Sequence, residues 1–281
     1  MASDRSYPPL PAPLPYPVTD NHTHIEPSQY FPAEPLALDQ QVAQAEAAGV
    51  SRIVQCGCDL KSARWTVEVA INNRAVVGAI AIHPNDAARL AQSNGYQEAF
   101  AEIVELAQSN DRVRAIGETG LDYFRTGLKG RPAQMRAFRD HIALAKQLGL
   151  ALQIHDRDAH DDVIETLLRD GAPERTVFHC FSGDRQMAAL AAKQGWYCSF
   201  AGTVTFKSGE ELRHAVSELP RELILVETDA PYLTPDPFRG RPNAPYMVPL
   251  TMAVLAERMG LSIEGACQQI QRNTSEVYGN W

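Results

Sequence analysis

The amino-acid sequence predicts an α/β fold, namely a (β/α)8 TIM barrel in a single domain. From residue 18 onward, short apolar segments alternate with longer amphipathic ones, which is typical of parallel βαβ units. Eight such repeats fit within 281 residues, an ordinary length for a closed barrel. An open doubly wound sheet would more often carry a glycine-rich phosphate loop after its first strand, and the sequence has none there.

The predicted elements follow from local periodicity and from the residues that end helices. Gly49 and Gly149 each follow a helical pattern, as expected of residues that terminate helices. We expect strands at 18–24, 50–56, 76–83, 113–118, 150–155, 176–180, 196–200 and 223–229. We expect helices at 38–49, 61–73, 96–108, 133–148, 159–170, 185–194, 210–218, 249–259 and 262–278.

Residues 1–17 form a proline-rich segment that precedes the predicted barrel domain, residues 18–281. Prolines stand at positions 8, 9, 11, 13, 15 and 17. Because proline fixes φ and removes a backbone donor, we expect an extended arm and no core element. The arm either lies on its own domain, forms a disordered leader or docks a partner.

Composition excludes several classes of protein. The net charge of −8 disfavours nucleic-acid binding through broad basic coverage, although bound metal ions can supply local positive charge in a nuclease. The five cysteines are too scattered for a disulfide framework and are expected to be reduced thiols. No apolar run approaches a membrane span and no secretory leader is visible, so we expect a cytoplasmic protein.

Polar residues interrupt the apolar strands at one place, their C-terminal ends. In a barrel these ends meet at the face where active sites are built. Because side chains alternate along a strand, those of His22 and His24 point to the same face, where the two imidazoles can coordinate one divalent ion. His83 ends the third strand. With His83 set aside, four histidines and two carboxylates would converge at this face, namely His22, His24, Glu118, His155, His179 and Asp229.

Taken singly, each of these residues has a plain structural explanation. A strand-end histidine is usually a core residue that bonds a carbonyl, and Glu118 or Asp229 could pair with an arginine. Six unrelated ionisable groups at one barrel mouth would however be costly, because each unpaired buried charge costs several kcal/mol. Two divalent metal ions remove that cost, and histidine with carboxylate ligands suits Zn²⁺, Mn²⁺ or Mg²⁺.

The chemistry of such a centre assigns provisional roles. His22, His24 and Asp229 would hold one ion, and His155 and His179 the other, with Glu118 placed to bridge them. Metal ions acidify bound water and polarise a phosphoryl or acyl oxygen. Asp229 is placed to orient or deprotonate the attacking water, although Asp229 and Glu118 could exchange this catalytic role.

Six ordered blocks of sequence resemble the TatD metal-dependent deoxyribonucleases, within the amidohydrolase-like barrels. The blocks are the stretches at 20–24, 81–84, 116–123, 153–159, 177–183 and 227–233, and Arg-Gly-Arg-Pro-Asn follows at 239–243. Related barrels of the dihydroorotase or phosphotriesterase type often bridge their metal ions with a carboxylated lysine. The fourth strand here ends in Glu118 and has no lysine nearby, so the resemblance favours the TatD family over those types.

The resemblance implies a dinuclear divalent metal centre at the six residues given above and hydrolysis of phosphodiester bonds in DNA. It implies that His83, Tyr123 and Arg157 contact substrate. Asp156 stands where the family often has serine and adds negative charge near the phosphate site. The resemblance does not extend to the proline-rich arm.

Loop residues after the strands are candidates for contact with nucleic acid. Tyr123, Phe124 and Phe206 could stack on bases of a single strand or could be core or rim aromatics. The basic candidates, each also explicable as a solvated surface charge, are Arg125, Lys129, Lys207, Arg239 and Arg241.

We therefore expect a metal-dependent hydrolase of ester bonds that degrades DNA, as an exonuclease on single-stranded or damaged ends. Single-stranded DNA is the expected partner, with no membrane and no obligatory protein partner. One alternative is a metal hydrolase of another ester or amide, such as aminoacyl-tRNA. Another is a metal-stabilised scaffold that binds partners through its proline-rich arm.

Overall fold

The computed structural model describes residues 5–27 and 35–281. Within them, eight parallel strands follow one another in the sheet in chain order, from β1 to β8, which is the topology of a (β/α)8 barrel and confirms the predicted fold class. The strands are β1 (Val18–Thr23), β2 (Val50–Gly57), β3 (Val76–Ile80), β4 (Val113–Asp122), β5 (Ala151–Arg157), β6 (Thr176–Phe178), β7 (Tyr197–Phe200) and β8 (Ile224–Val226).

Helices follow the strands, as the alternating pattern predicts. The α-helices are α1 (Leu38–Ala47), α2 (Leu60–Asn72), α3 (Pro84–Gln92), α4 (Tyr96–Gln108), α5 (Arg131–Leu148), α6 (His160–Asp170), α7 (Arg185–Gln194), α8 (Glu210–Glu218), α9 (Val248–Met259) and α10 (Ile263–Tyr278). Short 3-10 turns are η1 (Gly202–Thr205), η2 (Arg221–Leu223) and η3 (Pro245–Met247). None of the helices in the described ranges is long and apolar enough to span a bilayer.

The chain divides into two compact units, which are described separately below. The first unit comprises residues 1–55 and 183–279, and the second comprises residues 56–182 and 280–281.

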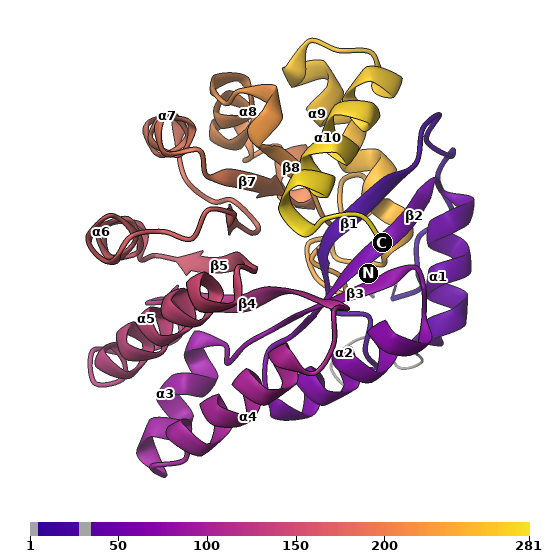
Figure 1. The fold of residues 1–281 in the computed structure, drawn as a ribbon. Helices are drawn as coiled ribbons and strands as arrows, with labels where there is room; N and C mark the ends of the chain where they lie inside the picture. The colour runs from indigo at the N-terminus through magenta and orange to yellow at the C-terminus, as the bar shows by residue number, and fades with distance from the viewer. Residues whose placement is uncertain (1–4, 28–34) are drawn as a thin grey trace. The chain divides into compact units, whose positions relative to one another are not determined.

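In the first unit, β1 pairs with β2 and β7 pairs with β8. The helix α10 runs beside β1 and β8 and buries Ile270 and Val277 (Figure 1). Near the end of β1 and just beyond β8, the backbone N–H of Asp229 donates to the carbonyl of His22 at 3.0 Å. The ends of β1 and β8 are thereby held side by side.

In the second unit, β3, β4, β5 and β6 form a continuous parallel ladder. The helix α5 packs on β4, where Phe138 of the helix and Ile116 of the strand are fully buried (Figure 1). Gly120 of β4 pairs with His155 of β5. A Cβ atom at Gly120 would lie 2.1 Å from the carbonyl oxygen of His155, and φ is +136°, so only glycine permits this close approach.

The structure differs from the predicted elements mainly at strand ends. β3, β6 and β8 stop before His83, His179 and Asp229, which lie in the segments that follow, whereas β4 continues four residues past Glu118 to Asp122. The helix α3 was not predicted. Its signal is Pro84, a residue well suited to the first turn of a helix, but the helix has only nine residues.

The described part of the proline-rich arm, residues 5–17, lies on the first unit. Arg241 donates from Nε to the Ser6 carbonyl at 3.0 Å and from Nη2 to the Tyr7 carbonyl at 2.7 Å. The hydroxyl of Tyr246 donates to the Pro8 carbonyl at 2.6 Å. These contacts fit an arm that lies on its own domain; residues 1–4 fall outside the described residues. The proposed boundary at residue 18 stays a prediction.

Candidate functional site

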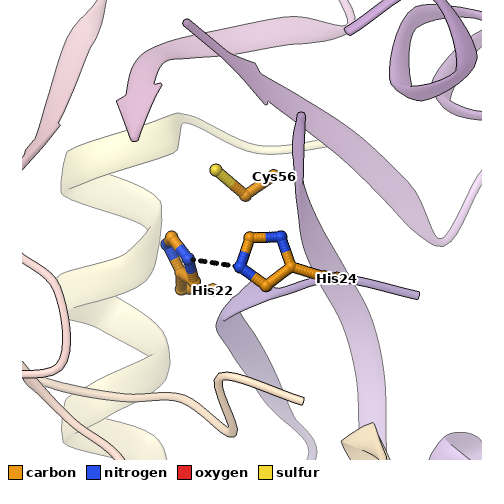
Figure 2. Close-up of side chains that lie close together, drawn as sticks. All are labelled: His22, His24 and Cys56. Atoms are coloured by element: carbon orange, nitrogen blue, oxygen red, sulfur yellow. Dashed lines mark hydrogen bonds between the residues drawn. The ribbon is translucent and has the colours of Figure 1, made fainter. Parts of the chain in front are cut away.

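The first unit brings two histidines and one aspartate together at the ends of β1 and β8. Nε2 of His22 lies 3.3 Å from Nε2 of His24, and the two rings are nearly perpendicular (Figure 2). Oδ1 of Asp229 lies 3.8 Å from Nε2 of His22 and 3.5 Å from Nε2 of His24. Three atoms that can ligate a metal therefore form a small triangle.

This triangle has the size that a single divalent ion requires. In a tetrahedral site with metal–ligand bonds of about 2.0–2.1 Å, neighbouring ligand atoms lie about 3.3 Å apart. The observed separations of 3.3, 3.5 and 3.8 Å are close to that spacing. Two imidazoles and one carboxylate also form a donor set that zinc and manganese accept. The three residues fit a divalent cation.

Backbone hydrogen bonds position the members of the triangle. Asp229 N–H donates to the His22 carbonyl at 3.0 Å, and His24 N–H donates to the Ala230 carbonyl at 2.8 Å. The residues that carry the three side chains are thus tied to one another across the gap between the two strands. The position of Asp229 relative to the histidines does not depend on side-chain packing alone.

Asp20 and Asn21, which begin the first motif, brace this region from within the core. Asp20 is fully buried and accepts hydrogen bonds from the backbone N–H and the hydroxyl of Thr228, at 2.9 and 2.5 Å. Burial raises the pKa of Asp20 well above its usual range. The Asn21 side chain donates to the Val226 carbonyl at 2.8 Å and accepts from Thr274 at 2.9 Å. These contacts tie β1 to β8 and α10.

The second unit gathers three histidines around Glu118, which is 5% exposed. Oε2 of Glu118 lies 2.8 Å from Nε2 of His179. Oε1 of Glu118 lies 3.1 Å from Nε2 of His83 and 3.7 Å from Nδ1 of His155. Nε2 of His179 and Nδ1 of His155 are 3.5 Å apart. The two oxygens of Glu118 and the facing nitrogens of His155 and His179 therefore lie 2.8–3.7 Å apart and are candidates for a second metal site.

Asp122 faces the His155 ring from the side opposite Glu118. Its Oδ2 lies 3.4 Å from Nε2 of His155, the ring nitrogen that points away from Glu118. Burial alone would raise the pKa of Asp122. The contact with His155 and the hydrogen bonds from Arg125 N–H and Asn85 outweigh it and bring that pKa below its usual range. Burial lowers the pKa of His155 and favours the neutral imidazole, the form that binds metals.

His83 is oriented differently from the other histidines. Its Nδ1 accepts the backbone N–H of Asn85 at 3.1 Å, so Nδ1 carries no proton. In a neutral imidazole the proton must then be on Nε2, the atom 3.1 Å from Glu118. A protonated nitrogen donates a hydrogen bond and cannot ligate a metal. This geometry favours His83 as a donor beside Glu118.

The other two predicted substrate residues differ in how available they are. The Tyr123 hydroxyl donates to Asp162, and the guanidinium of Arg131 lies 3.8 Å from the centre of the Tyr123 ring. Burial raises the pKa of Tyr123 to about 12. Arg157 is exposed at the end of β5, and its guanidinium lies 4.1 Å from the ring centre of Phe124.

Sequence reasoning missed Asp122, although its signal was present. Once β4 is known to extend to Asp122, alternation places Glu118 and Asp122 on the same face of the strand. The sequence also gave no sign that Asp156 accepts a hydrogen bond from His160, whose Nδ1 lies 2.7 Å from Oδ2 of Asp156. Arg241, one of the candidates for contact with nucleic acid, holds the proline-rich arm.

The topology and the two clusters define a (β/α)8 barrel with histidines and carboxylates suited to divalent metal ions, and the comparisons with known proteins identify its class as a metal-dependent hydrolase. The chain belongs to the TatD family, since the family model described as TatD related DNase matches residues 19–279. It is 41% identical to an uncharacterized metal-dependent hydrolase, TatD, of Mycobacterium tuberculosis, over 93% of this chain and 98% of that protein. It is 35% identical to the metal-dependent hydrolase YabD of Bacillus subtilis, over 92% and 98% of the two chains.

A solved structure supports the same assignment. The TatD homolog YJJV of Escherichia coli superposes with a TM-score of 0.81 at 27% identity, over 94% of this chain and 98% of that one. A TatD family hydrolase of Entamoeba histolytica has the same TM-score of 0.81 at 20% identity and supports the fold alone. The predicted family and barrel fold are confirmed.

Proposed function

We propose that this protein is a metal-dependent deoxyribonuclease that hydrolyses phosphodiester bonds, acting as an exonuclease on single-stranded or damaged ends of DNA. The observation that carries the proposal is the spacing of the ligand atoms of His22, His24 and Asp229. Their separations of 3.3–3.8 Å match the ligand spacing around one small divalent ion. The second unit supports a second ion through Glu118, His155 and His179.

Divalent ions at these residues would supply Lewis-acid activation of water and of the phosphoryl group. Asp229 is the carboxylate that we expect to orient the attacking water and accept its proton, while Glu118 holds the second ion. His83 presents an N–H group beside Glu118 and is suited to donate a hydrogen bond to a phosphate oxygen. Arg157, exposed at the end of β5, would bind the phosphate, and the anchored ring of Tyr123 would form part of the wall of the substrate-binding site.

DNA as the substrate is supported by the family description and by local charge. Although the net charge is −8, exposed cations follow the strands that carry the second cluster. Arg125 and Lys129, in the loop after β4, and Arg157, at the end of β5, are all exposed. Exposed cations beside metal ligands can attract the phosphates of a polyanionic substrate.

The test is metal analysis joined to hydrolysis of labelled oligonucleotides. The purified protein is analysed for zinc, manganese and magnesium, then incubated with end-labelled single-stranded DNA, with and without chelator. Matched double-stranded DNA and a phenyl ester serve as comparison substrates. We expect bound divalent metal and cleavage of single-stranded DNA that ends in mononucleotides and stops with chelator.

Two outcomes would overturn parts of this proposal. Chelator-insensitive cleavage would overturn the metal assignment. Bound metal with ester hydrolysis but no cleavage of DNA would overturn the nuclease assignment and point to another ester or amide as substrate.

A further inference from the structure

An exposed aromatic ring lies beside the second cluster. Phe124, two residues past the end of β4, is 63% exposed. The guanidinium of Arg157 lies 4.1 Å from its ring centre. Because the ring remains so exposed with a guanidinium over one side, its opposite face is open to solvent. Phe206, whose ring is also covered by an arginine, is by contrast only 8% exposed.

The loop that carries Phe124 is held from both sides. The Tyr123 N–H donates to the carbonyl of Arg157 at 2.9 Å, which extends the pairing of β4 with β5. The N–H of Arg125 donates to Oδ1 of Asp122 at 2.7 Å. The residues before and after Phe124 are therefore both fixed by hydrogen bonds. The exposed ring is presented by an ordered backbone.

Further hydrogen bonds anchor the same loop to α5 and α3. Oε1 of Gln134 accepts the N–H of Asp122 at 3.0 Å, and Nε2 of Gln134 donates to the Thr126 hydroxyl at 2.8 Å. The Thr126 hydroxyl donates in turn to Asn85 at 2.8 Å. Such preorganisation lowers the entropy that a ligand must overcome on binding.

Asp122 links this loop to the proposed metal ligands. One of its oxygens accepts the Arg125 N–H, and the other lies 3.4 Å from Nε2 of His155. Phe124 is therefore placed within the same unit, two residues from the carboxylate that orients a proposed ligand. The nearby cations Arg125 and Lys129 are exposed and can attract the phosphates that accompany a base.

We propose that Phe124, with Arg157 against one face, is a stacking platform for the base of an unpaired nucleotide. A base inside a duplex is already stacked on both sides, so only a single strand or a frayed end can offer its face to the ring. Phe124 thus determines the preference for single-stranded over double-stranded DNA. This inference rests on the proposed nuclease function and names the substrate form that its site selects.

The test measures binding, so that it does not depend on turnover. Phosphorothioate oligonucleotides, which resist cleavage, are titrated into the metal-loaded protein and followed by fluorescence anisotropy. One strand carries thymines, and a second strand of equal length carries abasic sites, so that both present the same backbone charge. Phe124→Ala is compared with Phe124→Trp and with Leu128→Ala, a change at a residue of the same loop that is 76% exposed.

Phe124→Ala is expected to raise Kd for the thymine strand about 5- to 100-fold, the usual loss of affinity when one base–aromatic stack is removed. Kd for the abasic strand should stay unchanged, Phe124→Trp should restore tight binding, and Leu128→Ala should have no effect. Equal losses on both strands, or none on either, would overturn the platform.

The two proposals fail in different ways. If the wild-type protein cleaves single-stranded DNA but Phe124→Ala binds it normally, only the platform is overturned. If the wild-type protein neither binds nor cleaves DNA, both are overturned. Because Phe124 is exposed, its replacement should leave the thermal unfolding midpoint unchanged, which circular dichroism checks.

Discussion

Nε2 of His155 lies 3.4 Å from Oδ2 of Asp122, while Nδ1 of the same ring faces Glu118 and His179. A carboxylate behind one imidazole nitrogen stabilises the proton there and leaves the other nitrogen free to ligate a metal. The relationship makes Asp122 a positioning residue that acts through His155.

Asp122→Asn should therefore weaken metal binding in the second unit. The amide keeps the size of the side chain but removes the negative charge that favours a protonated Nε2 on His155. Loss of such an outer partner typically lowers metal affinity about 10- to 100-fold. Titration with zinc, followed by calorimetry, measures the affinity. Asp140→Asn, in which the altered carboxylate accepts a hydrogen bond from Tyr96, is the control and should bind zinc normally. Equal affinities in both variants would contradict this role.

His22→Ala and Asp229→Asn should each abolish turnover while the protein stays folded. Either change removes one corner of the first donor triangle and, for Asp229, the expected proton acceptor. We expect the metal content to fall by one ion and activity on single-stranded DNA to fall at least about 100-fold. His214→Ala is the control, because that side chain is 40% exposed on α8. Near-normal activity in either site variant would show that the assignment is wrong.

His83→Gln and His179→Ala should separate hydrogen bonding from metal binding. The Nδ1 of His83 accepts the Asn85 N–H, so its Nε2 is a donor and no ligand is lost on substitution. His83→Gln should keep the full metal content and lower kcat, whereas His179→Ala should lose metal. Elemental analysis after gel filtration measures the metal content of both variants and so distinguishes a ligand from a hydrogen-bond donor. Loss of an ion in His83→Gln would mean that His83 is itself a ligand.

His141 should make the second unit sensitive to acid. It is fully buried on α5, its Nδ1 lies 2.7 Å from the Ala137 carbonyl, and its Nε2 accepts the Ile82 N–H at 3.2 Å. Burial lowers its pKa to about 4, below the unfolded value near 6.5. As the pH drops, His141 takes up a proton in the unfolded chain before it does so in the folded protein. The free energy of unfolding therefore falls between about pH 6.5 and about pH 4. The loss at the lower end is about 3 kcal/mol.

Urea unfolding with chelator present, at pH 7 and pH 4, tests this sensitivity. His141→Gln keeps a polar group at the position and cannot gain a proton. Its free energy of unfolding should therefore fall by about 3 kcal/mol less than that of the wild type between the two pH values. His214→Gln, at an exposed position, should behave like the wild type. The same acid loss in His141→Gln would exclude His141 as the cause.

The fold was predictable because its signals are local. Apolar runs separated by amphipathic segments placed all eight strands, and Gly149 ends α5 in the left-handed conformation, as its position in the sequence indicated. The helix α3 was missed because it is short and directly follows a strand-end motif. The strand ends were less predictable, since His83 and Asp229 continue the sequence pattern although hydrogen bonding of the ladder stops before them.

The candidate site was predicted as a set of residue types, and its role stays a prediction. Histidines and carboxylates could be singled out because they interrupt the apolar pattern at the ends of the predicted strands, where barrel enzymes build their sites. Their individual geometry could not be derived in the same way. Asp122 reaches His155 because β4 extends four residues past Glu118. Arg241, a candidate for contact with DNA or a solvated surface charge, holds the arm.

The sequence by itself determined the order of the strands and of the helices other than α3, the family and the choice of candidate metal ligands, because periodicity, helix ends and motif spacing act over short distances. Only the tertiary structure decided which histidine nitrogen faces a carboxylate, which loop aromatic stays exposed and where the arm lies. Those outcomes depend on hydrogen bonds between distant residues, such as Asn85 with Asp122, 37 positions apart, and Arg241 with Ser6, 235 positions apart. Side-chain directions at such contacts are set by packing, which local patterns do not encode.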